Sequence, residues 1–130
     1  MKESKCLEFK SAITNSFLKT VSAYSNFGDG EILFGVNDDG AVCGIDNLEQ
    51  VCLDIENKIN DSITPKPDFE IEIDEIKQTI RLMVYEGQYK PYLYKGKAYR
   101  RSDTASIEVD QAELKELVLL GSNLYFEELP

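Results

Sequence analysis

Charged side chains in the first forty residues lie where strands are expected, and their types suit the chemistry of a phosphate or metal site. Glu8 and Lys10 alternate with apolar neighbours over residues 6–10, which predicts a short strand with both charges on one face. Asp38 follows the apolar segment 31–36, which is typical of a buried strand. A plainer alternative is a strand-face pair of Glu8 and Lys10, with Asp38 acting only as a turn former.

A basic, tyrosine-rich segment occupies residues 87–101. It holds five basic residues and no acid, whereas residues 29–75 hold fourteen acids and two bases. Stacking on tyrosine combined with phosphate neutralisation is how proteins bind single-stranded nucleic acid. The alternative is a solvated hairpin with half-buried tyrosines, and its basic residues would point to both faces. The candidate nucleic-acid-binding residues are Lys90, Tyr92, Lys95, Lys97, Tyr99, Arg100 and Arg101.

The overall composition narrows the class of protein. The 130 residues fit one globular domain. The absence of histidine excludes Ser-His-Asp and Cys-His catalysis and zinc held by imidazole. The net charge of -10 works against nucleic-acid binding, because phosphate contacts need lysine and arginine. Three cysteines without metal-knuckle spacing indicate a reducing, cytoplasmic location. No apolar run reaches the roughly 20 residues of a membrane span, and no signal peptide opens the chain.

The order of elements predicts an α/β fold of the α+β kind, with a mixed, largely antiparallel sheet flanked by two to three helices. Capping boxes are expected at Asn47 with Gln50 and at Asp110 with Glu113, and Gly121 is expected to end the last helix. Apolar spacing indicates helices over residues 11–26, 48–59 and 110–120. Strands are expected over residues 6–10, 31–36, 41–45, 69–73, 79–85, 91–94 and 97–101, with hairpin turns at 37–40 and 95–96.

Several short blocks follow one another in a specific order along the chain. They are Glu3-Ser4, Leu7-Glu8-Phe9-Lys10, Val21-Ser22-Ala23-Tyr24-Ser25-Asn26, Gly28-Asp29-Gly30, Phe34-Gly35-Val36, Asp38-Asp39-Gly40, Pro91-Tyr92 and Lys97-Ala98-Tyr99-Arg100-Arg101. Together they resemble the Schlafen-type Alba-like domain over nearly the whole chain. The resemblance implies that residues 1–121 form this domain and that residues 122–130 extend toward a downstream region of a longer protein.

The resemblance also implies a function connected with nucleic acids. Bacterial members of the family are usually N-terminal domains of proteins described as transcriptional regulators, and they are labelled DNA-binding. Animal Schlafen proteins with a paired form of the domain include RNA endonucleases whose active site uses three carboxylates. By resemblance these carboxylates fall on Glu3, Glu8 and Asp38, which would hold Mg²⁺ or Mn²⁺. Lys10 would then hold a phosphate or stabilise developing charge.

Three functions stay open at this point. The first is a nucleic-acid-binding domain of a bacterial transcriptional regulator, with DNA or RNA as partner. The second is a metal-dependent endoribonuclease, and the third is a dimerisation or ligand-sensing module without direct nucleic-acid contact. Some family members carry an ATP-binding label, but Gly28-Asp29-Gly30 lacks both phosphate-loop patterns and predicts only the end of a helix. The sequence assigns no cofactor apart from Mg²⁺ or Mn²⁺ in the nuclease alternative.

Overall fold

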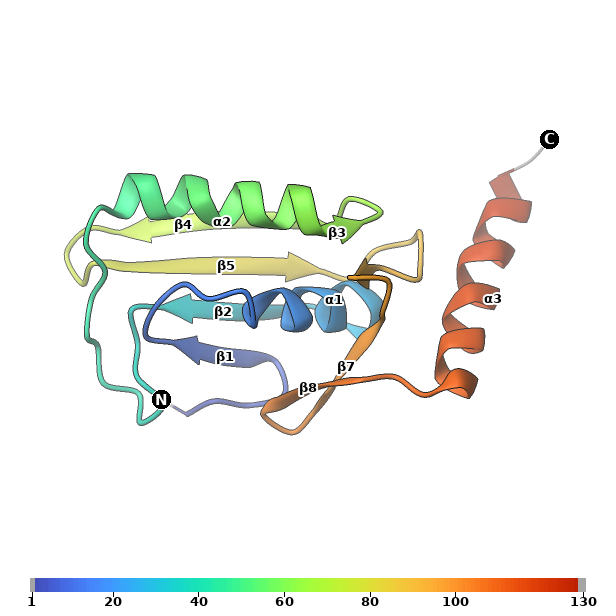
Figure 1. The fold of residues 1–130 in the computed structure, drawn as a ribbon, viewed down its shortest axis with the longest axis horizontal. Helices are drawn as coiled ribbons and strands as arrows, with labels where there is room; N and C mark the ends of the chain where they lie inside the picture. Colours follow the sequence, from blue (N-terminus) through green and yellow to red (C-terminus); the bar gives the residue numbers. More distant parts are fainter. Residues whose placement is uncertain (1, 129–130) are drawn as a thin grey trace.

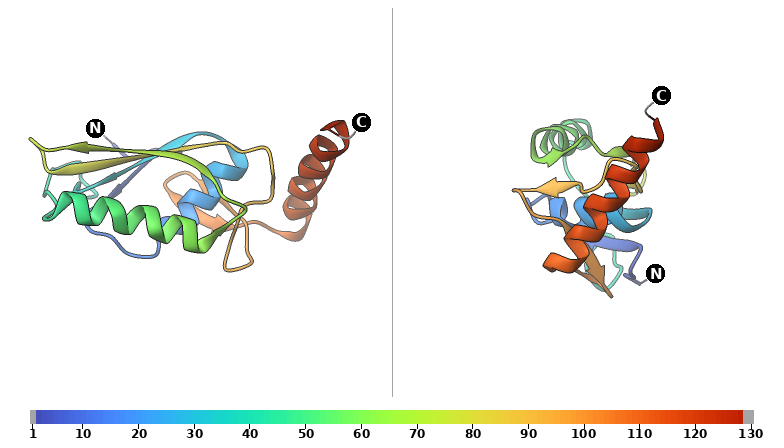
Figure 2. Two further views of the ribbon diagram at one scale, coloured as in Figure 1. Left: turned by 90° about the horizontal axis from the view of Figure 1, so that it is seen from above. Right: turned by 90° about the vertical axis from the view of Figure 1, so that its right-hand side faces the viewer.

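The computed structural model describes residues 2–128 as a four-stranded sheet with two helices packed on one face (Figures 1 and 2). The elements are β1 (Leu7–Lys10), α1 (Phe17–Phe27), β2 (Gly30–Phe34), α2 (Leu48–Ser62), β3 (Ile63–Thr64), β4 (Asp68–Asp74), β5 (Thr79–Tyr85), β6 (Leu93–Tyr94), β7 (Tyr99–Ser102), β8 (Ala105–Glu108) and α3 (Gln111–Glu128). The strand order is β1-β2-β5-β4, and of its three pairings only β1 with β2 is parallel. The predicted α+β fold with a mixed, largely antiparallel sheet is confirmed.

The core lies between the sheet and the two helices. Successive side chains of a strand point to opposite faces. One face of β2 and β5 therefore buries Ile32, Phe34, Ile80, Leu82 and Val84. The Phe17 ring of α1 meets the Phe34 ring edge-on at 5.3 Å, and Ile55 and Ile59 of α2 complete the layer. The opposite face of the sheet is more open to solvent, and there Arg81 pairs with Glu31 and Glu72.

Buried polar side chains of α1 hold the segment that contains β6 and β7. Ser22 Oγ and Asn26 Nδ2 both donate to the Tyr92 carbonyl, at 2.8 and 2.9 Å. The Tyr92 amide donates to Asn26 Oδ1 at 2.7 Å, and the Tyr99 amide donates to Ser22 Oγ at 3.2 Å. Buried backbone groups must be hydrogen-bonded somewhere. Ser22 and Asn26 therefore clamp a strand segment that is far away in the sequence.

Replacing Asn26 with alanine is expected to lower the free energy of unfolding by about 1–3 kcal/mol, because the Tyr92 amide would lose its buried acceptor. Urea-induced unfolding measures the loss. Asn57→Ala on the exposed side of α2 is the matched control and should stay within about 0.5 kcal/mol of wild type. Equal stability of the two variants would contradict the clamp.

The hairpin expected over residues 91–101 is wrong except at its turn. Lys95 and Gly96 both have positive φ, and Tyr94 and Lys97 exchange backbone hydrogen bonds of 2.9 and 3.0 Å across them. The two arms then separate, because β6 pairs with β3 and β7 pairs with β8. The clamp from α1 explains this separation, since it takes the backbone groups that a longer ladder would use.

Two boundaries near the first helix and the first hairpin also differ from expectation. The helix begins at Phe17 rather than at residue 11. Its predicted first turn contains Thr14 and Ser16, whose hydroxyls lie 2.9 Å apart, and such residues favour local side-chain bonds over helix. The strand expected over residues 41–45 is reduced to a single bridge between Val36 and Val42, because the amides of Cys43 and Gly44 both donate to the Gly35 carbonyl.

The helix ends show which capping predictions were sound. The capping box of α3 is confirmed, since Glu113 N donates to Asp110 Oδ1 at 2.8 Å and Asp110 N donates to Glu113 Oε1 at 3.2 Å. Asn47 is a left-handed residue with no capping side-chain bond, so that capping box is wrong. The predicted stop at Gly121 is also wrong, because α3 continues to Glu128. A side chain at Gly121 would collide with the Lys90 carbonyl, so this glycine permits close packing.

The last helix leaves the body of the domain (Figures 1 and 2). Its buried residue Leu117 packs in a small cluster with Ala98 and Val109, beside Leu93. Among the helices that the structure describes, none combines the length and apolar character needed to cross a membrane.

Candidate functional site

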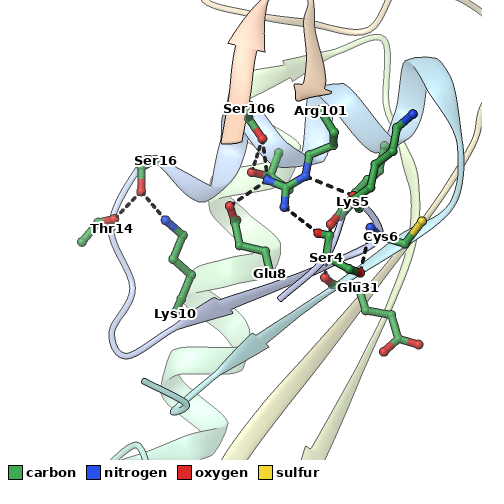
Figure 3. A network of polar contacts seen from close by, with 12 residues as sticks. Ser4, Lys5, Cys6, Glu8, Lys10, Thr14, Ser16, Glu31, Arg101 and Ser106 are labelled. Atoms are coloured by element: carbon green, nitrogen blue, oxygen red, sulfur yellow. Dashed lines mark hydrogen bonds and ion pairs between the residues drawn. The ribbon is translucent and has the colours of Figure 1, made fainter. Parts of the chain in front are cut away.

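The structure joins the N-terminal strand to the basic segment through one buried ion pair. Arg101 Nη1 on β7 donates to Glu8 Oε1 on β1 at 3.0 Å (Figure 3). Only 3% of the Arg101 side chain and 9% of the Glu8 side chain are exposed. A buried charge pair of this kind needs further hydrogen bonds to offset the loss of hydration.

Arg101 has those further bonds. Its Nε and Nη2 donate to the carbonyls of Lys5 and Ser4, at 3.1 and 3.0 Å. Its Nη1 also donates to Ser106 Oγ at 3.0 Å, and the guanidinium lies 5.7 Å from the centre of the Tyr24 ring. Arg101 therefore fixes the N-terminal segment against β7, β8 and α1, and four of its five N–H donors are already used inside the protein.

The three candidate carboxylates lie in one neighbourhood but in different environments. Glu8 is buried and its Oε2 has no hydrogen-bond partner, Glu3 is partly buried, and Asp38 is exposed. Burial raises the pKa of Glu3, the backbone of Phe9 opposes the rise, and the negative charges of Asp38 and Glu8 add to it. The structure thus brings the charges of all three close enough to interact.

This shift predicts how pH affects stability. The folded chain binds a proton at Glu3 more tightly than the unfolded chain does, so the free energy of unfolding falls as pH rises from the ordinary glutamate pKa, roughly 4.3, through the raised value. Glu3→Gln removes this titration. We expect the variant to be more stable than wild type at neutral pH, with no difference below about pH 4.

Urea-induced unfolding at a series of pH values measures the difference between Glu3→Gln and wild type. Glu75→Gln, an exposed change in the turn between β4 and β5, is the control for the loss of one negative charge. A Glu3→Gln variant that is less stable than wild type at neutral pH would show that the ionised carboxylate is favoured in the fold.

The carboxylates do not fit a bound metal ion as they are arranged here. Their oxygens are of the hard type that Mg²⁺ and Mn²⁺ prefer. Within residues 2–128, however, no three acidic or cysteine side chains gather into a set that could hold a metal ion. Glu8 Oε1 is also committed to Arg101. We therefore derive no catalytic step through a metal, and the ligand role of Glu3, Glu8 and Asp38 stays a prediction.

Lys10 is held at the beginning of α1. Its Nζ donates to Ser16 Oγ at 3.0 Å, and the Ser16 hydroxyl lies 2.9 Å from Thr14 Oγ1 (Figure 3). Lys10 and Glu8 come from the same strand but have separate partners, so they do not form an ion pair with each other. A phosphate-binding role for Lys10 stays a prediction.

The structure divides the basic segment into buried and exposed residues. Tyr92, Tyr99 and Arg101 are 2%, 8% and 6% exposed, so the two rings are largely covered by protein. Lys90 pairs with Glu86. Arg100 Nε lies 2.9 Å from Glu113 Oε2 but is not aligned for a hydrogen bond. Of the seven candidates, only Lys95 and Lys97 are exposed.

Where β6, β7 and α1 meet, exposed lysines lie over two tyrosines whose rings are largely buried. Lys19 Nζ lies 5.8 Å from the centre of the Tyr99 ring, and Lys95 Nζ lies 5.4 Å from that of Tyr94. The two ring centres are 6.4 Å apart. Lys97 follows the same turn and is bonded to Tyr94 through the backbone. We call these five residues the lysine–tyrosine patch: Lys19, Tyr94, Lys95, Lys97 and Tyr99.

Two lysines of this patch, Lys19 and Lys95, differ from other described lysines without an ion-pair partner, such as Lys77 and Lys115, because each lies over a tyrosine ring. Among the side chains that the structure describes, neither Lys19 nor Lys95 forms an ion pair with a carboxylate, and Lys97 pairs with Glu108 only loosely, at 3.5 Å. Lys19 was missed by sequence reasoning. The available signal was a lone lysine within a largely apolar helix, where a charge must face water.

Comparison with known proteins gives one family and two similar structures. The family described as Schlafen, AlbA_2 matches residues 3–110. The DIP2311 protein from Corynebacterium diphtheriae has a TM-score of 0.59 at 16% identity over 86% of this chain. The N-terminal domain of a protein from Nitrosomonas europaea, described as related to the ATP-dependent DNA helicase RecG, has a TM-score of 0.51 at 25% identity.

Coverage differs between these two structures. This chain spans only 26% of the C. diphtheriae protein, but 84% of the N. europaea domain, which in turn covers 85% of this chain. The likeness to the C. diphtheriae protein concerns the fold alone. A search of curated proteins found no match.

Proposed function

The chain belongs to the Schlafen AlbA_2 family, and from this premise we propose that it is a nucleic-acid-binding domain whose lysine–tyrosine patch contacts phosphates. The observation that carries the proposal is that two exposed ammonium groups without carboxylate partners among the described side chains, Lys19 and Lys95, each lie over a tyrosine ring, in a protein with a net charge of -10. Unpaired lysines are the groups that neutralise phosphates and release counterions.

The acidic charge elsewhere does not prevent such contact. At physiological ionic strength charges are screened beyond about 8 Å, so a phosphate near Lys19 and Lys95 interacts chiefly with those two groups. The tyrosines beneath them hold the ammonium groups in place, which reduces the entropy lost on binding. The N. europaea domain, which belongs to a RecG-related protein, supports a role near nucleic acid.

Fluorescence anisotropy tests the proposal. Labelled single- and double-stranded DNA and RNA are titrated with the protein at increasing salt concentration. With two or three phosphate contacts, log K should fall against log salt with a slope of about -1.4 to -2.1 for single strands and about -1.8 to -2.7 for duplex DNA. Failure of every probe to bind at low salt would remove the proposed function.

We further propose that the domain serves a bacterial transcriptional regulator, the setting that the family resemblance implies. Incubation with a random library of DNA duplexes tests this role. Enrichment of particular sequences would support it, and uniform recovery of the library would contradict it.

The family resemblance implies a second candidate, RNA cleavage with Mg²⁺ or Mn²⁺, for which Glu3, Glu8 and Asp38 would have to leave the arrangement described above. Burial raises the pKa of Glu3, and the negative charges of Asp38 and Glu8 add to the rise, so the three carboxylates lie in one neighbourhood. Incubation with tRNA and Mn²⁺ tests this candidate, with Asp38→Asn as the variant because Asp38 is exposed. RNA left intact by wild type would remove it.

A further inference from the structure

A cavity of about 280 Å³ lies beside the end of α1, on the side of Arg101 where Lys5 and Cys6 are found (Figure 3). Ligand pockets in proteins usually measure roughly 300–1,000 Å³, so this cavity lies just below the small end of that range and suits a single small ring system rather than a larger ligand. We call it the Phe27 pocket. Its apolar wall consists of Ala23, Tyr24 and Phe27, and its polar edge includes Asp29, Arg100 and Glu113.

The apolar wall offers a surface for stacking. Phe27 is the last residue of α1 and is 46% exposed, although the ring is large and apolar. An aromatic face at the side of a cavity can stack on a second flat ring, and such stacking does not depend on which base is presented. The wall therefore suits a planar aromatic group.

The polar edge offers both donors and acceptors. Arg100 Nε is buried and has no aligned acceptor, although Glu113 Oε2 lies 2.9 Å away. Asp29 Oδ1 accepts from the Glu86 amide at 2.7 Å, which leaves the other carboxylate oxygen of Asp29 for a further donor. The lining presents both signs of charge, since it holds the cations Lys5, Arg100 and Arg101 and the carboxylates Asp29 and Glu113. A hydrocarbon would leave these polar groups without partners. A nucleobase has a flat face with donors and acceptors around it, and it suits this edge best.

The pocket is connected to the lysine–tyrosine patch along one helix. Lys19 and Phe27 are both exposed and lie eight residues apart on α1, about 12 Å along the helix axis, with the buried Ala23 between them. Lys19 belongs to the patch, and both Ala23 and Phe27 line the pocket. A short single strand with its phosphates on the patch can therefore reach the pocket.

We propose that the Phe27 pocket takes one unpaired base of a single-stranded nucleic acid whose phosphates lie on the lysine–tyrosine patch. This proposal rests on the proposed nucleic-acid binding, and it specifies the class of ligand as single strands with an accessible base. The probe is a short single strand carrying one 2-aminopurine, whose fluorescence falls when the base stacks. Wild type should quench the fluorescence, and Phe27→Ala should abolish the quenching and weaken binding by about 5- to 100-fold.

Tyr89→Ala is the matched control, because Tyr89 is 58% exposed and does not line the pocket. It should leave both quenching and affinity unchanged. Thermal unfolding monitored by circular dichroism checks that Phe27→Ala is folded, which its exposure favours. If wild type and Phe27→Ala bind and quench alike, the pocket assignment is overturned while the proposed function stands. If wild type binds no probe at any salt concentration, both are overturned.

Discussion

Replacing Arg101 with methionine is expected to lower the free energy of unfolding by about 3–5 kcal/mol. The variant leaves the Glu8 carboxylate buried without its cation, and a buried charge without a partner is strongly destabilising. The same change removes the donors to the carbonyls of Ser4 and Lys5 and to Ser106 Oγ. Urea-induced unfolding of wild type and variant measures the loss.

Arg81→Met is the control that separates the loss of a buried ion pair from the loss of an arginine in general. Arg81 also pairs with a strand glutamate, Glu31, but its side chain is 44% exposed, so we expect a change below about 1 kcal/mol. The double variant Glu8→Leu with Arg101→Met should recover part of the stability, because it leaves no unpaired charge in the interior. An Arg101→Met variant as stable as Arg81→Met would contradict the assigned role.

The elements that sequence patterns predict well depend on local chemistry. The strand expected over residues 79–85 matches β5, and the Asp110–Glu113 capping box forms as expected. The Lys95-Gly96 turn also forms, since its two residues adopt the positive φ that a two-residue hairpin turn requires. In each case the atoms that decide the structure lie within a few residues of one another.

The predictions that fail depend on distant contacts. The arms of the expected hairpin separate because Ser22 and Asn26, about seventy residues earlier, take the backbone groups of Tyr92 and Tyr99. No local pattern contains this information. The sequence places Ser22 and Asn26 in the block of residues 21–26 that supports the family resemblance. Only the fold shows that the two side chains clamp a distant strand segment.

The environment of Arg101 in the candidate site also depends on a distant contact. Arg101 looks like part of a basic, solvent-facing segment, yet its partner Glu8 lies 93 residues away in the chain. The pairing is visible only after β1 and β7 are placed against α1. A charged residue flanked by tyrosines can thus be either a nucleic-acid contact or a structural bond, and burial decides between them.

The double variant Lys19→Gln with Lys95→Gln is expected to weaken nucleic-acid binding at least about tenfold at low salt and to reduce the magnitude of the salt slope by about 2. Glutamine keeps much of the side-chain length but removes the positive charge. Each lysine is exposed and lies over a tyrosine ring, a contact worth about 0.5–1 kcal/mol at such sites, so the fold should survive. Anisotropy titrations at several salt concentrations measure both changes.

A control variant separates the effect of these two lysines from the effect of a more negative net charge. Lys77→Gln with Lys115→Gln changes the charge by the same amount, from -10 to -12 for two lost lysines, at exposed positions outside the patch. If affinity depends on the overall field, both double variants should lose it equally. If phosphates contact Lys19 and Lys95 directly, only the patch variant should lose slope, because a counterion is released only where a phosphate is neutralised. Equal slopes for the two variants would therefore place the nucleic acid elsewhere on the domain.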